Sequence, residues 1–383
     1  MKEYKYLYQK MLDETVIRKA YTKLRKGKTK RKEIQSIDAN LDTEVAAMKE
    51  MIQNTRPPGV AVEKPELAYR PCKRNPKFIF EHGKQRKIFM PEIHEQWLHH
   101  IIVLILEPII MATAYRFSCG SFPKRGIHYG KKQILKWIRS GADIRNFGKI
   151  DIRHFYDNIR IDVLMKELSI RIKDGWFLYI IKLCLKGFRK GIPLGFYISQ
   201  WLANYILAPL DRFVTECLGI EKFVRYMDDM VFYANSKKRL HEAILQIMRF
   251  IGRRFRLKLK RTYQVCKFYY VGKKGTIGRP LDFMGFLFFR DRTIIRKSIM
   301  IKATALAQKL CSAKTAGRRY FVNHIKAMLS YMGWFSCTDT YDCYRERIKP
   351  FVNIGKLKKI VSKLDRRDDY YEAVEKGTLC QAA

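Results

Sequence analysis

Apolar residues recur with helical spacing in some stretches of this chain and alternate with polar residues in others. Helical spacing predicts helices over 1–56, 92–115, 128–140, 161–187, 199–217 and 237–256. Alternating or short apolar runs predict a hairpin over 77–91 around His82-Gly83, a strand over 149–153, two strand halves over 222–234 and a strand or hairpin over 281–290. The chain after Arg290 reads as helical and basic. Because strands and helices mix without a regular βαβ spacing, the pattern predicts an α+β fold with helices on one face of a sheet.

Charge sets the class of partner. The 383 residues contain 77 Lys and Arg against 36 Asp and Glu, a net charge of +41, and 47% are hydrophobic. This hydrophobicity excludes a disordered chain, and the excess positive charge indicates a polyanionic partner. Nucleic acid fits best, with an anionic membrane surface as the weaker alternative. The basic run Arg18–Lys32 around Tyr21 is either a solvated helix face or a phosphate-tracking surface, and both readings stay open.

Cysteine usage and apolar runs bear on the compartment. The nine cysteines form no CxxC pair, so we expect free thiols in a reducing cytosol and no zinc site. The first residues contain no apolar signal region, and the most apolar run, Trp97–Leu106, is too short to cross a bilayer. We therefore expect a cytoplasmic protein without a membrane partner.

The most informative polar feature is Tyr226-Met227-Asp228-Asp229, an acidic pair between two apolar strand halves. Two neighbouring carboxylates are costly to bury unless a cation neutralises them, and Mg²⁺ prefers carboxylate oxygens. An exposed turn with two Asp residues is the alternative. Asp151 stands at the predicted end of another strand, although it could instead cap the next helix, a role for which Asp157 is better placed. Carboxylates from neighbouring strands can hold two metals about 3.5–4 Å apart for in-line phosphoryl transfer.

A glycine loop, Gly191–Gly195, lies between these acidic segments and opens a helix that Ser199 could cap. Such a loop is ordinary by itself. It becomes informative through its position, after an Asp at a strand end and before an Asp-Asp hairpin. This order resembles the palm of reverse transcriptases.

Several motifs carry that resemblance over roughly residues 80–290. DIRHFYDNI resembles the first metal-binding motif of the family, PLGFYISQ the glycine loop, YMDD the catalytic hairpin and LDFMGFLFF the primer-grip hairpin. RKIFMPEI…LEPII and SFPKRGIHYGKKQIL resemble the fingers motifs of bacterial and group II intron-type enzymes. The resemblance implies a right-hand polymerase fold with an N-terminal basic helical extension (1–80), fingers (81–146), palm (147–290) and a helical basic thumb with a tail (291–383).

The resemblance also implies roles for individual residues. Asp151, Asp228 and Asp229 would be catalytic carboxylates that hold two Mg²⁺ ions, with Mn²⁺ as a substitute, and Ile152 would add its backbone carbonyl. Tyr156 would be the steric gate that selects deoxynucleotides, or else a core aromatic.

Basic and loop residues complete the implied site. The triphosphate would be held by Lys124 and Arg125, or by Arg86 and Lys87. Leu194, Gly195 and Gln200 would lie at the nucleotide, and Lys258, Lys260 and Gly285 at the nucleic acid. Either Lys258 or Lys260 could protonate the pyrophosphate leaving group; the sequence does not choose between them.

One departure bears on the subtype. Most reverse transcriptases carry Gln where this chain has Leu194, and Pro where it has Gln200. LGFYISQ resembles instead the enzymes of diversity-generating retroelements, which copy template adenines with errors. The resemblance then implies a bacterial or phage-encoded RNA-directed DNA polymerase. Its partners would be a dedicated structured RNA template, a DNA or RNA primer, dNTPs and a small basic accessory protein. The alternatives are a defence-associated, retron-like or intron-like reverse transcriptase, and then a non-catalytic RNA-binding scaffold.

Overall fold

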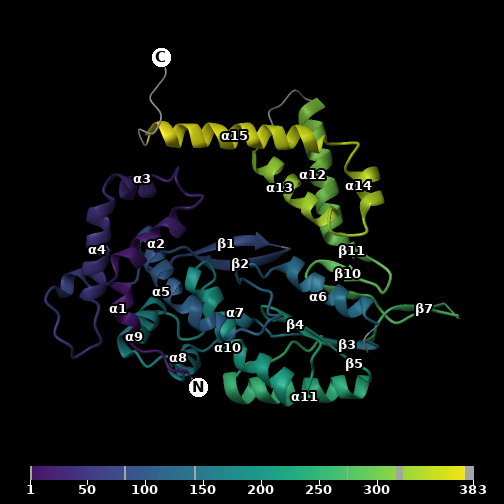
Figure 1. Cartoon of the computed structure of the whole chain (residues 1–383), viewed down its shortest axis with the longest axis horizontal. Coiled ribbons are helices and arrows are strands. Elements are labelled where there is room, and N and C mark those ends of the chain that lie inside the picture. Colours follow the sequence, from purple (N-terminus) through teal and green to yellow (C-terminus); the bar gives the residue numbers. More distant parts are fainter. Residues whose placement is uncertain (1, 82, 142–143, 274, 316–321, 376–383) are drawn as a thin grey trace. The chain divides into compact units, whose positions relative to one another are not determined.

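The computed structural model describes residues 2–81, 83–141, 144–273, 275–315 and 322–375 (Figure 1). The chain forms two compact units, Met1–Val265 and Cys266–Ala383. The predicted hairpin residue His82 and the ninth cysteine, Cys380, lie outside the described residues, and the eight described cysteines are free thiols. Among the described residues, no helix is both long and apolar enough to cross a membrane.

A four-stranded sheet has the strand order β4-β5-β3-β6, and its first three strands lie within the first unit. Its strands are β4 (Phe223–Tyr226), β5 (Asp229–Ala234), β3 (Asn146–Asp151) and β6 (Gln264–Lys267). The boundaries predicted for the strand over 149–153 were wrong. Strand β3 begins at Asn146 and ends at Asp151, and Ile152 forms only an isolated bridge with Leu259. The split strand over 222–234 is confirmed as the β4–β5 hairpin.

Long helices build the core of this unit. They are α5 (Ile93–Met111), α6 (Ile127–Arg139), α10 (Tyr197–Arg212) and α11 (Lys237–Phe255). Helix α5 is apolar on nearly every face and packs against α10, while α11 contacts β3 and β5 with one apolar face. Ser236 caps α11 by accepting a hydrogen bond from the Arg239 backbone N–H at 3.1 Å. The helices predicted near these ranges are confirmed.

Two helix predictions need correction. The segment 161–187 contains α8 (Ile161–Ser169) and α9 (Gly175–Cys184), because Asp174 caps α9 by accepting from the Phe177 N–H at 3.0 Å. The helix expected at 199–217 begins at Tyr197 and ends in a π-helical turn, Phe213–Cys217. Ser199 is therefore not its cap, and its hydroxyl donates to the Pro193 carbonyl at 2.7 Å.

Neither candidate Asp caps the helix after β3. Asp157 lies inside the short helix α7 (Phe155–Asn158), whose N-cap is His154, and Arg160 is the N-cap of α8. Asp151 is instead the last residue of β3, and its side chain does not cap a helix.

The N-terminal segment forms four helices: α1 (Leu7–Met11), α2 (Glu14–Arg25), α3 (Lys32–Ala39) and α4 (Leu41–Gln53). A 3₁₀ turn, η1, spans Pro65–Leu67. Tyr21 is 2% exposed and donates to Asp38 at 2.7 Å, so its ring lies in the core; a phosphate-tracking role for the basic run Arg18–Lys32 stays a prediction. The Trp97 indole N–H donates to the Ile17 carbonyl at 2.9 Å, which ties α2 to α5.

The hairpin predicted over 77–91 is confirmed as β1 (Pro76–Glu81) and β2 (Lys84–Phe89), paired from Pro76↔Phe89 to Glu81↔Lys84. It forms a two-stranded sheet of its own.

The second unit combines short strands with helices. Its strands are β7 (Tyr270–Gly272), β8 (Gly275–Ile277), β9 (Leu281–Phe283), β10 (Phe286–Phe288) and β11 (Thr293–Ile295). Its helices are α12 (Lys297–Thr315), α13 (Val322–Phe335), α14 (Tyr341–Arg347) and α15 (Ile354–Glu375). The hairpin predicted at 281–290 is β9–β10. Gly285 forms its turn at φ 86°, where an added Cβ would lie 2.6 Å from the Trp334 ring.

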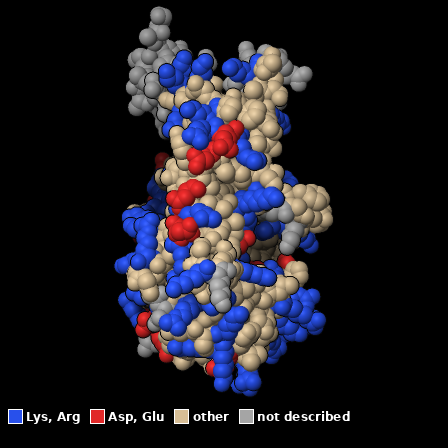
Figure 2. Space-filling model, turned by 90° about the vertical axis from the view of Figure 1, so that its right-hand side faces the viewer, with Lys and Arg blue, Asp and Glu red and all other residues tan. Residues whose placement is uncertain are grey.

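Positive charge is widespread on one face of the molecule. Figure 2 shows this face, with Lys and Arg side chains over most of it and Asp and Glu side chains gathered in a few places. This distribution follows from the net charge of +41.

Candidate active site

Strand register brings the predicted carboxylates together. Asp151, the last residue of β3, pairs directly with Asp229, the first residue of β5. Asp228 precedes Asp229 in the β4–β5 turn, and its backbone carbonyl accepts from the Ile152 N–H at 3.3 Å. Residues opposite each other on antiparallel strands have Cβ atoms about 4.5–5.5 Å apart, so these side chains meet where β3 ends and β5 begins.

Two carboxylate oxygens at this edge lack partners. Oδ1 of Asp151 and Oδ1 of Asp229 are buried without a hydrogen bond. The other oxygens have cationic neighbours: Lys260 Nζ lies 2.6 Å from Asp151 Oδ2, and Lys149 Nζ lies 3.5 Å from Asp229 Oδ2. A buried acceptor without a donor costs free energy, which a cation would recover.

Burial also perturbs the acidity of the pair in the turn. Burial, reinforced by the charge of Asp151, raises the pKa of Asp228 to about 6. Burial raises the pKa of Asp229 to about 7, with Lys149 opposing the shift and Asp151 and Asp228 adding to it. Crowded, desolvated carboxylates of this kind favour a bound divalent cation over two free negative charges.

The donor set fits a cation only in part. No group of three or more His, Cys, Asp or Glu side chains among the described residues could hold a metal ion by itself. The two unpartnered oxygens supply some ligands, and Mg²⁺ characteristically completes its shell with water and substrate phosphates.

Tyr156 lies beside these carboxylates, in α7. Burial, with the charge of Asp228 adding to it, raises the pKa of its hydroxyl, and the positive charge of Arg86 acts in the opposite direction. Its backbone carbonyl accepts from the Ile192 N–H at 2.9 Å, which joins α7 to the glycine loop. The predicted gate residue, the loop and Arg86 are therefore near one another.

The glycine loop contacts the β1–β2 hairpin directly. The Phe89 N–H donates to the Leu194 carbonyl at 2.7 Å, and Gly195 adopts φ 100°. A Cβ at position 195 would lie 2.2 Å from the Phe89 carbonyl oxygen, so only glycine fits. Gln200 is exposed on α10.

The remaining predicted cations have different surroundings. Lys124 is exposed at φ 59°, whereas Arg125 donates to the Tyr115 carbonyl at 2.9 Å. Lys87 lies over the Phe89 ring, 5.2 Å from its centroid. Lys258 lines a basic cavity of about 490 Å³ whose other residues are Arg153, His154, Asp157, Asn158, Lys190 and Arg256. Of the two lysines between which the sequence does not choose, Lys260 is the one that contacts Asp151.

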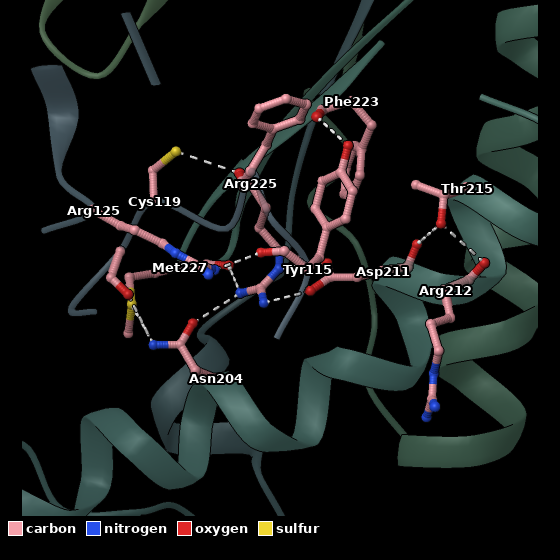
Figure 3. A network of polar contacts seen from close by, with 12 residues as sticks. Tyr115, Cys119, Arg125, Asn204, Asp211, Arg212, Thr215, Phe223, Arg225 and Met227 are labelled. Carbon is pink, nitrogen blue, oxygen red and sulfur yellow. Dashed lines mark hydrogen bonds and ion pairs between the residues drawn. The ribbon is translucent and has the colours of Figure 1, made fainter. Parts of the chain in front are cut away.

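A buried network beneath the turn was missed by sequence analysis (Figure 3). Arg225 forms a bidentate ion pair with Asp211 at 2.6 and 2.7 Å, and it also donates to Asn204 and to the Met227 carbonyl. The available signal was a charged residue inside each of two apolar segments, since buried charges require a partner of opposite sign.

Comparison with known proteins identifies the family of this chain. The family model for reverse transcriptase (RNA-dependent DNA polymerase) matches residues 72–286, more than half of the chain. The chain belongs to the reverse transcriptase family. This membership confirms the predicted α+β, right-hand polymerase fold, and the family as a whole depends on divalent metal ions.

The curated relatives of this reverse transcriptase match shorter stretches of the chain than the family model does. Protein YkfC of Escherichia coli is 25% identical over 146 residues, covering 35% of this chain and 38% of the relative. The group II intron-encoded protein LtrA of Lactococcus lactis is 29% identical over 143 residues, covering 35% and 23%. Among solved structures, telomerase from Candida albicans has 13% identity and a TM-score of 0.44, covering 80% of this chain and 59% of that one. This reverse transcriptase thus spans less than two fifths of either curated relative.

Proposed function

We propose that this reverse transcriptase is an RNA-directed DNA polymerase that copies a structured RNA template into cDNA. A primer 3′-hydroxyl would attack the α-phosphorus of a dNTP, forming a new P–O bond and releasing pyrophosphate. The observation that carries the proposal is the pairing of Asp151 with Asp229 beside Asp228, with two buried carboxylate oxygens left unpartnered.

The residues present divide the work of this reaction. Asp151, Asp228 and the Ile152 carbonyl would hold two Mg²⁺ ions, for which Mn²⁺ substitutes, with Asp229 in support. When bound, these ions neutralise charge on the attacking and leaving oxygens. Lys260, whose Nζ lies 2.6 Å from Asp151 Oδ2, would be the lysine that protonates pyrophosphate. Tyr156 would exclude a 2′-hydroxyl from the sugar site.

Charge supports the proposed partners. A net charge of +41 suits an RNA template paired with a DNA or RNA primer, because lysines and arginines that neutralise phosphates release counterions. We also propose a small basic accessory protein and a cytoplasmic location in a bacterial or phage system.

For the subtype we propose error-prone copying of template adenines in a diversity-generating retroelement. Leu194 cannot supply the amide that most of the family would use against the template and nucleotide, so geometric selection should loosen. The alternative is a defence-associated, retron-like or intron-like enzyme, and one of the relatives is an intron-encoded protein.

Primer extension on a mixed-sequence RNA with Mg²⁺ and four dNTPs tests both levels of the proposal. The blank is the double variant Asp228→Ala, Asp229→Ala. cDNA with errors concentrated opposite adenines supports the diversity-generating subtype, and Leu194→Gln should then reduce those errors. Accurate cDNA, or errors that Leu194→Gln leaves unchanged, would remove that subtype. Absence of cDNA even with the cognate RNA and accessory protein would leave an RNA-binding scaffold.

A further inference from the structure

Three buried polar side chains lie beneath the β4–β5 turn (Figure 3). Arg225, Asn204 and Asp211 are 1%, 2% and 0% exposed, and we call them the turn-bracing triad. Asp211 and Asn204 come from α10, and Arg225 comes from β4. The triad therefore joins the helix behind the sheet to the strand that leads into the acidic turn.

Arg225 reaches the turn itself. While its Nε and Nη2 are held by Asp211, its Nη1 donates to the Met227 carbonyl at 3.0 Å and to Asn204 Oδ1 at 3.1 Å. Met227 adopts φ 54°, a left-handed conformation that costs a non-glycine residue about 1–2 kcal/mol. Because the Met227 carbonyl belongs to the peptide that precedes Asp228, the guanidinium fixes the peptide from which that carboxylate projects.

The triad also holds the loop 117–122. The Cys119 N–H donates to the Arg225 carbonyl at 2.7 Å, and Asn204 Nδ2 donates to the Gly120 carbonyl at 2.9 Å. Gly120 packs so closely that an added Cβ would lie 2.6 Å from Met227 Sδ. The loop that leads to the predicted triphosphate residues is thus tied to the Asn204 side chain and to the Arg225 backbone.

Stability does not explain why this site is polar. A buried ion pair is often no more stabilising than apolar side chains of similar volume, because desolvation offsets the attraction. A bidentate guanidinium does, however, fix direction as well as distance. The distinctive contribution of the triad is therefore geometric.

We propose that Arg225, oriented by Asp211 and Asn204, is a positioning residue whose guanidinium fixes the acidic turn, while Asn204 joins that turn to the loop 117–122. Asp228 then meets the metal and the incoming nucleotide in a set geometry. Arg225 itself touches neither. This inference rests on the proposed polymerase function.

The test compares Arg225→Lys with Arg254→Lys. Arg254 is a suitable control because it also forms a bidentate pair, with Glu167 at 2.9 Å for both contacts, and joins α11 to α8 away from the turn. Rates are corrected for the folded fraction by thermal denaturation. Arg225→Lys should lower kcat about tenfold or more and raise the Mg²⁺ concentration for half-maximal rate, with little change in KM for the template–primer. Arg254→Lys should change neither.

Equal kinetic effects from both variants, or a loss accounted for by unfolding, would overturn the inference. If Arg225→Lys does not fold, Asn204→Leu replaces it, since that change leaves the ion pair with Asp211 in place. Wild-type protein that makes no cDNA would defeat the proposed function instead. Tb³⁺ luminescence, measured against the Asp228→Asn, Asp229→Asn variant, then decides: weaker Tb³⁺ binding by Arg225→Lys upholds the inference, and unchanged binding refutes it.

Discussion

Replacement of Asp229 by asparagine should stabilise the metal-free protein at alkaline pH. The pKa of Asp229 is about 7 in the folded protein, against 3.8 for the unperturbed side chain. Between these values the folded state binds a proton that the unfolded state has lost, so stability falls as pH rises from about 4 to 7. Asparagine carries no charge and removes this loss.

The size of the effect follows from the shift. Each pKa unit corresponds to about 1.4 kcal/mol, so a shift of about three units sets an upper limit of about 4 kcal/mol. The side chain is 27% exposed and lies 3.5 Å from Lys149, a contact that asparagine would weaken. We therefore expect a net gain of about 2 kcal/mol at pH 8 relative to pH 4.5.

Chemical denaturation in EDTA at both pH values measures this gain. Saturating Mg²⁺ should reduce the stability gain of Asp229→Asn at pH 8, because the cation stabilises the wild-type carboxylate cluster. The control is Asp162→Asn, where the ion pair with Arg160 lowers the carboxyl pKa; the carboxyl is ionised in both the folded and the unfolded state from pH 4.5 to 8, so this variant should lose a similar amount of stability at both pH values. An Asp229→Asn effect that is the same at both pH values would refute the argument from burial.

Three further outcomes are expected. Gly195→Ala should lower the rate of primer extension at least about tenfold, because its Cβ would collide with the Phe89 carbonyl and displace the β1–β2 hairpin. The free energy of unfolding should fall by less than the tenfold rate loss corresponds to. Steady-state kinetics measures the rate, and thermal denaturation measures the stability. Lys260→Ala should slow single-nucleotide addition more than Lys258→Ala, since Lys260 is the one of these two lysines that contacts Asp151, and equal losses would contradict the proposed role. Tyr156→Val should increase ribonucleotide incorporation relative to dNTP incorporation, and an unchanged ratio measured in competition would show that the ring is not the gate.

The local sequence pattern was sufficient to predict which acidic residues form the site. Asp228 and Asp229 interrupt two apolar strand halves, so the turn that holds them could be placed without knowledge of the tertiary structure. Asp151 could be placed near a strand end, although the strand predicted over 149–153 continues two residues past it. Their pairing across β3 and β5 then follows from antiparallel register. A glycine at position 195 could be expected in a loop, although its contact with Phe89 could not.

Other features depended on contacts between distant segments. The apolar spacing continues through Ile170 and Ile172, so the break between α8 and α9 is visible only through the cap at Asp174. Tyr21 lies in a basic run, yet its ring faces the core while neighbouring lysines face solvent. Strand β6 is short and largely exposed, and therefore carried no hydrophobic signal.

The packing of α2 against α5 determines where this protein can be truncated without loss of folding. The family match begins at residue 72, yet Ile17 and Trp97 are fully buried in one core. A fragment cut at the family boundary would bare the apolar surface of α5 to water, and such surfaces promote aggregation. Expression of the catalytic region therefore calls for the N-terminal helices as an integral part of it, and the limits of homology are a poor guide to the limits of folding.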